Sequence, residues 1–282
     1  MNAWHITQGS AKTTTRSNLY GAMFYARWCD RSGVDLWAAT TEDVTAFIAW
    51  YSEQAGQYSV IRRLTSIKAL YAFAVATGRS PTNPASSISV KLPVPAPKRP
   101  FTEGELRRIL AATRGQRERA LMFMFIDCGV RLSEAAGMDV EDIDWENGLV
   151  LVTGKGRKER YLHPGARALA ALRRYVGDRS GPVWLSAGLR PDQQGQRLSV
   201  PSIYRIVKDV AARAGVAKAY PHRFRTTFAC MFHGDSHGDI QSLMMLMGHT
   251  KVATTLAYSR WSAAQQALQQ QARYSLGDRI SV

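Results

Sequence analysis

The segment YPHRFR at residues 220–225 has the residue types and the spacing to bind a phosphate group. Pro221 suits the first position of a helix, and His222 and Arg225, three residues apart, then share one helix face. The N-terminus of a helix also attracts anions, because its first backbone N–H groups have no partner within the helix. The segment therefore indicates an anion site, with an ordinary basic surface as the alternative.

Lys155, in the sequence Gly154-Lys155-Gly156, lies in a second basic segment. The segment is not a phosphate-binding P-loop, because position 149 is Leu where that motif needs Gly, and position 156 is Gly where it needs Ser or Thr. Two interpretations stay open. The segment is either a basic hairpin tip with no further role, or a short rigid turn that holds Lys155 towards a phosphate or a leaving oxygen.

Three further segments carry reactive residue types that also have an ordinary structural explanation. Arg131 and Glu134 have the spacing of a surface ion pair. Tyr258 follows a Met-rich run at 243–247 that is typical of a core, and it can be an aromatic residue of that core. The tract HGDSHGD at 233–239 offers possible metal ligands, but its glycines disfavour a regular helix face, so we expect a polar loop and no metal. Those ligands would be His233, Asp235, His237 and Asp239.

The chain after residue 100 predicts mainly helices. Thr102 and Glu105 form a capping-box pattern at the start of one of them. The hydrophobic period changes at 148–163, where two β-rich runs flank the Gly-Lys-Gly turn and predict a hairpin. A short strand is expected at Val183–Leu185. The expected helices span 102–113, 116–127, 164–176, 199–214, 222–232, 238–247 and 262–274.

The first 87 residues predict a separate helical domain. Its third helix carries three basic residues, which are either phosphate contacts or a solvated face: Arg62, Arg63 and Lys68. Residues 80–100 contain six prolines and indicate an extended linker, in which Lys98 and Arg99 add positive charge. The expected helices are 14–31, 41–55 and 58–77. The expected divisions are a helical domain at 1–87, a basic Pro-rich linker at 88–100, a second domain at 101–261 and a tail helix at 262–282.

The composition favours a polyanionic partner. The 282 residues carry 37 Lys and Arg against 22 Asp and Glu, a formal charge of +15, with a globular 45% of hydrophobic residues. The longest apolar run, residues 120–126, is too short to span a membrane, and no secretory signal is evident. Three widely spaced cysteines (Cys29, Cys128 and Cys230) form no disulfide framework and no metal-binding pair, so we expect a cytoplasmic protein.

Four segments, in this chain order, resemble the motifs of the tyrosine recombinase (phage integrase) family: CGVRLSEAAGM, VTGKGRKERYLHP, YPHRFRTTFA and LMGHTKVATTLAYSR. The N-terminal helices and the basic linker are similar to the core-binding domain and interdomain connector of that family. The resemblance implies a mainly α, two-domain fold: a helical core-binding domain and an α+β catalytic domain with a small β-sheet or hairpin. It also implies a simple Xer-like or integrase type without an arm-binding domain.

The same resemblance implies six catalytic residues, with Glu134 in a supporting position. Two guanidinium groups suit the extra negative charge of a phosphorane-like transition state, with no metal and no other cofactor. A tyrosine nucleophile forms a 3′-phosphotyrosine bond that can be religated without ATP. The phosphate-clamping arginines are Arg131 and Arg225, the general acid is Lys155, the base is His222, the second phosphate ligand is His249 and the nucleophile is Tyr258.

The resemblance implies a site-specific DNA recombinase, an integrase or resolvase, that acts on double-stranded DNA as a homotetramer on paired sites. It leaves open an accessory or directionality factor, and the tail helix is expected to dock on a neighbouring protomer or on its own domain. A type IB topoisomerase and a DNA-binding regulator without catalysis are the alternatives. The expected DNA contacts are Arg62, Arg63, Lys68, Lys98, Arg99, Arg157 and Lys158.

Overall fold

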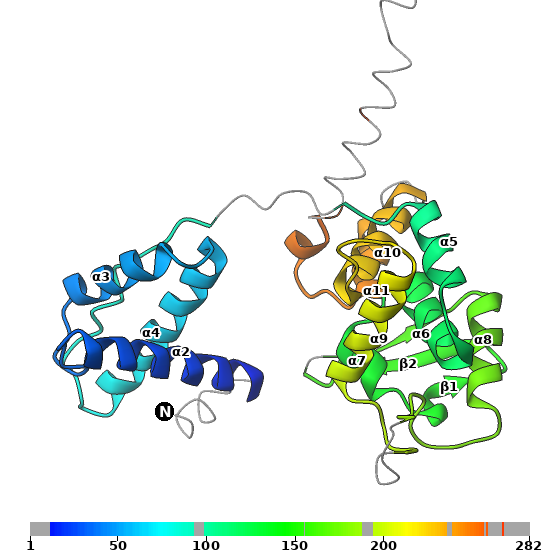
Figure 1. Cartoon of the computed structure of the whole chain (residues 1–282), viewed down its shortest axis with the longest axis horizontal. Coiled ribbons are helices and arrows are strands. Elements are labelled where there is room, and N and C mark those ends of the chain that lie inside the picture. Colours follow the sequence, from blue (N-terminus) through cyan, green and yellow to red (C-terminus); the bar gives the residue numbers. More distant parts are fainter. Residues whose placement is uncertain are drawn as a thin grey trace, which may run out of the picture. The chain divides into compact units, whose positions relative to one another are not determined.

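The chain forms two compact units, Met1–Ala96 and Pro97–Val282, whose boundary falls within the predicted linker (Figure 1). None of the described helices is both long and apolar enough to cross a membrane. The predicted tail helix lies outside the described residues, apart from Ala267. The computed structural model describes residues 12–92, 99–154, 156–187, 194–235, 239–256, 258 and 267.

Three helices form the described part of the N-terminal unit: α2 (Lys12–Arg31), α3 (Thr41–Ser52) and α4 (Gln57–Ala76). The Thr40 hydroxyl accepts from the Asp43 amide at 3.2 Å, and the Asp43 carboxylate accepts from the Thr40 amide at 2.8 Å, so a capping box begins α3. Aromatic rings from the three helices share one core, in which the Tyr25 ring lies edge-on to Phe47 and to Tyr71.

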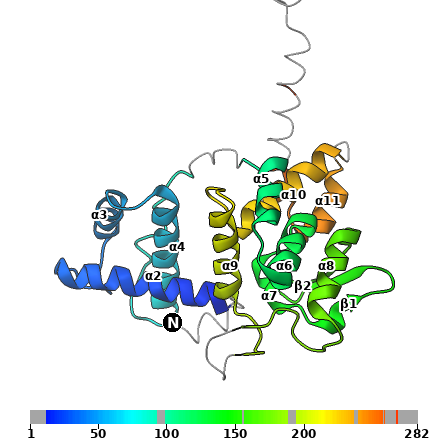
Figure 2. The same ribbon diagram turned by 45° about the vertical axis from the view of Figure 1, so that its right-hand side comes forward.

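The C-terminal unit is built around one central helix, α6 (Gly115–Cys128). Its other described helices are α5 (Glu103–Ala111), α7 (Leu132–Gly137), α8 (Ala166–Val176), α9 (Val200–Arg213), α10 (Pro221–Asp235), α11 (Ile240–Met247) and a 3-10 turn, η1 (Val140–Asp142). Helices α5, α8, α9 and α10 all pack on α6 (Figure 2). This cover explains why residues 120–125 are buried without a polar face.

A small antiparallel sheet completes this unit, in the order β1 (Ile143–Asp144), β2 (Leu149–Thr153) and β3 (Glu159–Leu162). Val150 pairs with Leu162 and Thr153 pairs with Glu159, which confirms the predicted hairpin. The Gly154 amide donates to the Lys158 carbonyl at 2.7 Å and closes the turn. The described turn residues, Gly154 and 156–158, therefore lie beyond the paired ends of β2 and β3.

The structure corrects several local predictions. The chain at 183–185 is not a strand, because the only bridges there are isolated ones, Asp139 with Pro182 just before it and Leu185 with Arg197 at its end. Helix α10 continues to Asp235, so the polar loop expected at 233–239 is shorter than predicted. Neither α7 nor β1 is predicted from the sequence, because six and two residues are too few to show a hydrophobic period.

Candidate active site

Four segments of the C-terminal unit converge on one site. Arg131 immediately precedes α7, and His222 and Arg225 lie in the first turns of α10. His249 follows the glycine that ends α11, and Tyr258, itself helical, comes two residues after the helical residues 252–256. The structure thus brings together five of the six residues that the sequence singles out, and Lys155 lies outside the described residues.

A buried carboxylate organises one side of the site. Glu134 is 1% exposed, and its Oε1 accepts from Arg131 Nη1 and from Arg160 Nη1, both at 2.6 Å. Burial would raise the pKa of Glu134, but the hydrogen bonds and charges of Arg160, then those of Arg131, lower it to about 2. The surface ion pair considered for Arg131 and Glu134 is therefore wrong, because Glu134 is a charged core residue shared by two arginines.

Arg225 is almost fully buried beside Arg131. Its Nη1 donates to the Gly129 carbonyl at 2.8 Å and its Nη2 donates to the Met247 carbonyl. Gly129 ends α6 with a φ of 54°, in the left-handed region that glycine adopts readily, and so turns the chain towards Arg131. Burial, then the charge of Arg131, lowers the pKa of Arg225 to about 10, which leaves it a cation at neutral pH.

Backbone carbonyls at the C-terminus of α11 accept hydrogen bonds from several arginines of the site. Arg131 Nη2 donates to the carbonyls of Met247 at 2.8 Å and Gly248 at 3.0 Å, and Arg160 Nε donates to that of Leu246 at 2.8 Å. These carbonyls have no partner within the helix and carry the negative end of its dipole, so they suit guanidinium donors. Gly248, at φ 56°, then turns the chain into His249.

Both ring nitrogens of His249 have partners. Nε2 lies 3.3 Å from Arg225 Nη2 and Nδ1 lies 2.9 Å from Thr255 Oγ1. Burial, then the charges of Arg225 and Arg131, lowers the pKa of His249 to about 4, so the ring is neutral at pH 7. Because a guanidinium can only donate, Nε2 accepts from Arg225, and Nδ1 carries the proton and donates to Thr255.

Tyr258 lies in a small apolar cluster against α10 and α11. It is 8% exposed and packs with Cys230, Leu243 and Met247, while Met245 of the same Met-rich run is exposed. Its ring is stacked on that of His249. Burial raises the pKa of Tyr258, and the charges of Arg225 and Arg131 act in the opposite direction.

Two cavities open next to these residues. One, of about 800 Å³, lies between the β2–β3 hairpin and α11 and is lined by Arg131, Arg160 and His249 among others. The other, of about 260 Å³, is lined by Arg131, Arg225 and the exposed His222, together with Tyr204. Arg131 thus lines both cavities.

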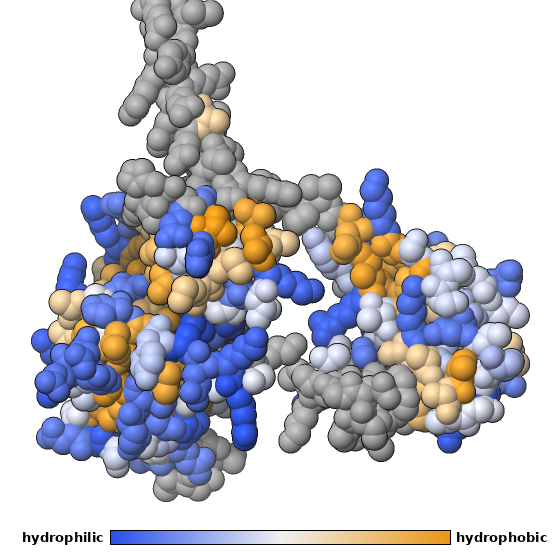
Figure 3. Space-filling view, turned by 180° about the vertical axis from the view of Figure 1, so that it is seen from behind, coloured by the Kyte–Doolittle hydropathy of each residue, from blue (hydrophilic) through white to orange (hydrophobic). Residues whose placement is uncertain are grey.

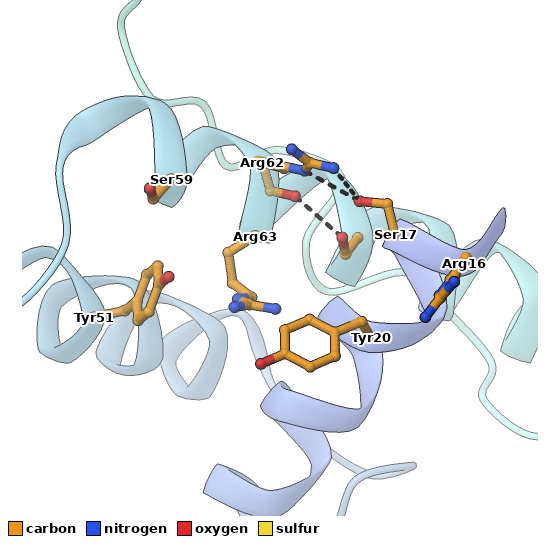
Figure 4. Close-up of a pocket in the computed structure, with 8 residues that line it drawn as sticks. Arg16, Ser17, Tyr20, Tyr51, Ser59, Arg62 and Arg63 are labelled. Atoms are coloured by element: carbon orange, nitrogen blue, oxygen red, sulfur yellow. Dashed lines mark hydrogen bonds between the residues drawn. The ribbon is translucent and has the colours of Figure 1, made fainter. Parts of the chain in front are cut away.

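The predicted DNA contacts differ in their surroundings. Arg62 is exposed, and its Nη2 donates to Ser17 Oγ at 2.7 Å (Figure 4). The Arg63 guanidinium instead lies 4.3 Å from the centre of the Phe24 ring. Lys68 donates to a backbone carbonyl at 3.1 Å. In the C-terminal unit Arg99, Arg157 and Lys158 are exposed, and Lys98 lies outside the described residues.

Two residues that hold the site together are not found from the sequence. Arg160 stands in a β-strand five residues after Lys155, among other basic residues, and nothing in its spacing sets it apart. Thr255 is one of several threonines after His249, and its burial distinguishes it from the exposed Thr254. The role of Arg160 depends on contacts between elements that are distant in the sequence. The role of Thr255 depends on the path of the chain after α11.

Hydrophilic side chains cover most of the face of each unit seen in Figure 3, as the charge of +15 predicts. Among the described residues, no group of three or more His, Cys, Asp and Glu side chains could hold a metal ion. His237 of the tract considered for a metal lies outside those residues. The cysteines Cys29, Cys128 and Cys230 are buried and form no disulfide.

A helical unit joined to a mainly α unit, with a tyrosine beside two arginines and a histidine, has the architecture of the tyrosine recombinases. Residues 99–265 match the phage integrase family, and residues 6–78 match the N-terminal SAM-like domain of phage integrases. The chain belongs to the phage integrase family.

Curated relatives carry the name tyrosine recombinase XerC. That of Myxococcus xanthus is 32% identical over 92% of this chain and 91% of its own length. That of Xanthomonas campestris is 34% identical over 71% of this chain, but the match spans 63% of that protein, less than two thirds of its length.

Solved structures share the fold at low sequence identity. A lambda integrase dimer bound to a COC′ core site has a TM-score of 0.69 and 17% identity, covering 90% of this chain and 93% of that one. XerH recombinase bound to a palindromic difH substrate has a TM-score of 0.67 and 18% identity, covering 84% of this chain and 72% of that one.

Proposed function

We propose that the protein is a site-specific DNA recombinase that cleaves and rejoins DNA strands through a 3′-phosphotyrosine intermediate, with neither metal nor ATP. One observation carries this proposal: Tyr258 is stacked on His249 next to the two guanidinium groups of Arg131 and Arg225. The fold that the chain shares with DNA-bound recombinases supports the same conclusion.

Tyr258 attacks the scissile phosphorus in this proposal. The oxygen of its phenol forms the new P–O bond, the 5′-oxygen leaves, and the phenol proton passes to a base, for which the exposed His222 is the candidate. The raised pKa of Tyr258 means that it is protonated before substrate arrives, so proton removal belongs to the cleavage step. Lys155 is the proposed acid for the leaving 5′-oxygen.

Arg131 and Arg225 stabilise the charge that develops on the non-bridging oxygens. Arg225 remains a cation at neutral pH, and both arginines are held by carbonyls at the end of α11 before substrate binds. A preorganised cationic site of this kind lowers the barrier without reorganisation during the reaction. In the free protein His249 Nε2 accepts from Arg225, so this nitrogen must gain a proton when substrate binds before it can donate to a phosphate oxygen.

The proposed partner is double-stranded DNA, bound by both units and recombined by a homotetramer on paired sites. Arg62, with the exposed Arg16 across a cavity of about 440 Å³, is the proposed phosphate contact of the N-terminal unit (Figure 4). Arg63 is left out of that role because its guanidinium packs on aromatic rings. The protein would then work in the cytoplasm, at the nucleoid.

Covalent trapping tests the proposal. The protein is mixed with supercoiled plasmid carrying the chromosomal DNA that flanks its gene, in EDTA, and denatured with SDS. We expect a protein–DNA adduct that maps to Tyr258, abolished in Tyr258→Phe and kept in Tyr161→Phe, which removes an exposed hydroxyl. An adduct in Tyr258→Phe, or cleavage that requires Mg²⁺, contradicts the proposal.

A further inference from the structure

Arg160 of β3 lies at the centre of the site, although it belongs to none of the proposed catalytic roles. Its side chain is 10% exposed, and all three of its guanidinium nitrogens donate. Nη1 and Nη2 bind the two carboxylate oxygens of Glu134 at 2.6 and 2.9 Å, and Nε binds the carbonyl of Leu246 at 2.8 Å. One planar group therefore joins three elements, β3, α7 and α11.

The carboxylate that Arg160 holds is the one that fixes Arg131. Glu134 Oε2 accepts from the Arg131 backbone amide at 2.7 Å, and Oε1 accepts from Arg131 Nη1 at 2.6 Å. Rotation of this carboxylate would move the Arg131 guanidinium with it. The two-point contact with Arg160 blocks that rotation, since both carboxylate oxygens are engaged at once.

The third contact of Arg160 acts on the other side of the site. The carbonyl of Leu246 directly precedes those of Met247 and Gly248, which accept from Arg131. His249 follows them, and its amide donates to the carbonyl of Met244 at 3.0 Å. Arg160 holds the last turn of α11 on β3 and so also fixes the backbone position of His249.

The geometry points to Arg160 as a positioning residue for the cleavage reaction, one that sets the place of Arg131 through Glu134 and that of His249 through the end of α11. This inference rests on the proposed function. A lysine cannot take over the role, because its single ammonium group lacks the planar fork that binds two carboxylate oxygens and a carbonyl together.

Adduct formation by single and double variants tests the inference. In the plasmid trapping reaction we expect Arg160→Lys to lower the adduct rate about 100-fold, because small misplacements of reacting groups have effects of that size. Noncovalent binding of the same plasmid should stay unchanged, and the thermal midpoint should fall no further than in the control variant Arg197→Lys. Arg197→Lys is the matched control, since Arg197 also binds one carboxylate and two carbonyls, but those of Asp139, Ala136 and Met138.

A double-mutant cycle separates positioning from a general structural role. If Arg160 and Glu134 act as one unit, the variant with Arg160→Lys and Glu134→Gln should react as slowly as the slower single variant. Hydrogen exchange at the His249 amide should quicken in Arg160→Lys and not in Arg197→Lys. Rate effects that multiply in the double variant, or unchanged exchange at His249, overturn the inference.

The two proposals fail in different ways. A wild-type protein that forms no adduct refutes the proposed function. A wild-type protein that reacts, together with an Arg160→Lys variant that reacts as fast, overturns the positioning role alone. If Arg160→Lys does not fold, Glu134→Gln takes its place in the comparison, and an unchanged rate in that variant is equally decisive.

Discussion

The imidazole of His249 is stacked on the phenol of Tyr258, with ring centroids 6.0 Å apart and ring planes 11° apart. In this arrangement the two nitrogens of His249 point along its own ring plane, to Arg225 and to Thr255. The ring therefore packs on the proposed nucleophile, while its two nitrogens are engaged by Arg225 and Thr255. In the proposed reaction the proton of Tyr258 would therefore pass to another group, and His249 Nε2 would have to gain a proton before it could donate to a phosphate oxygen.

Thr255→Val should slow cleavage by about 10-fold. The change removes the acceptor of the His249 Nδ1 proton while it keeps the volume of the side chain. A lost hydrogen bond of about 1.4 kcal/mol corresponds to a factor of about 10 in rate if the neutral ring changes its tautomer or its orientation. Adduct formation under single-turnover conditions measures the effect. Thr254→Val, at the exposed neighbouring position, should react at the wild-type rate.

The low pKa of His249 predicts a distinct pH response. Because the folded-state pKa, about 4, lies below the usual 6.5, the ring stays neutral in the folded protein through neutral pH and binds a proton only near pH 4. The unfolded chain takes up that proton from about pH 6.5 downwards, so stability is lost as the pH falls from 6.5 towards 4. Titration of the His249 ring by NMR should show no change between pH 8 and about 5.5. A midpoint near 6.5 contradicts this prediction.

Glu134→Leu should destabilise the C-terminal unit by about 3–5 kcal/mol, because it leaves Arg160 buried without its counter-ion. Hydrogen exchange at the buried amides of α6, measured in the full chain, reports the free energy of unfolding of that unit. Glu103→Leu is the matched control. It breaks an exposed ion pair with Arg107 and should change the same free energy by less than about 1 kcal/mol.

The features predicted from the sequence are those that depend on residues close together in the chain. The capping box of Thr102 and Glu105 forms as expected, with hydrogen bonds of 3.1 and 2.8 Å. Likewise, His222 and Arg225 come to lie in the first turns of one helix because three residues make about one turn. The hairpin follows from the change of hydrophobic period around its glycines.

The features that are not predicted depend on how distant elements cross. Glu134 and Arg160 are 26 residues apart, and their contact exists because β3 runs past α7. The pattern RLSE allows a surface pair and a buried network equally well, since the sequence does not say what covers the first turn of α7. Tertiary packing decides the charge state and burial of Glu134.

Substitution of Arg62 should weaken DNA binding, whereas substitution of its neighbour in α4, Arg63, should lower the stability of the protein. Arg62 is exposed, so Arg62→Ala should weaken DNA binding at every sequence and reduce the slope of log affinity against log salt by about 1. The Arg63 guanidinium lies over the rings of Phe24, Tyr51 and Tyr20, at 4.3, 5.2 and 5.6 Å from their centres, so Arg63→Ala should lower stability and leave that slope unchanged.

Fluorescence anisotropy on labelled duplex at several salt concentrations, with thermal unfolding in parallel, measures both effects. Equal salt slopes for wild type and Arg62→Ala would remove Arg62 from the DNA interface, and a reduced slope for Arg63→Ala would mean that its guanidinium leaves the aromatic rings to reach a phosphate.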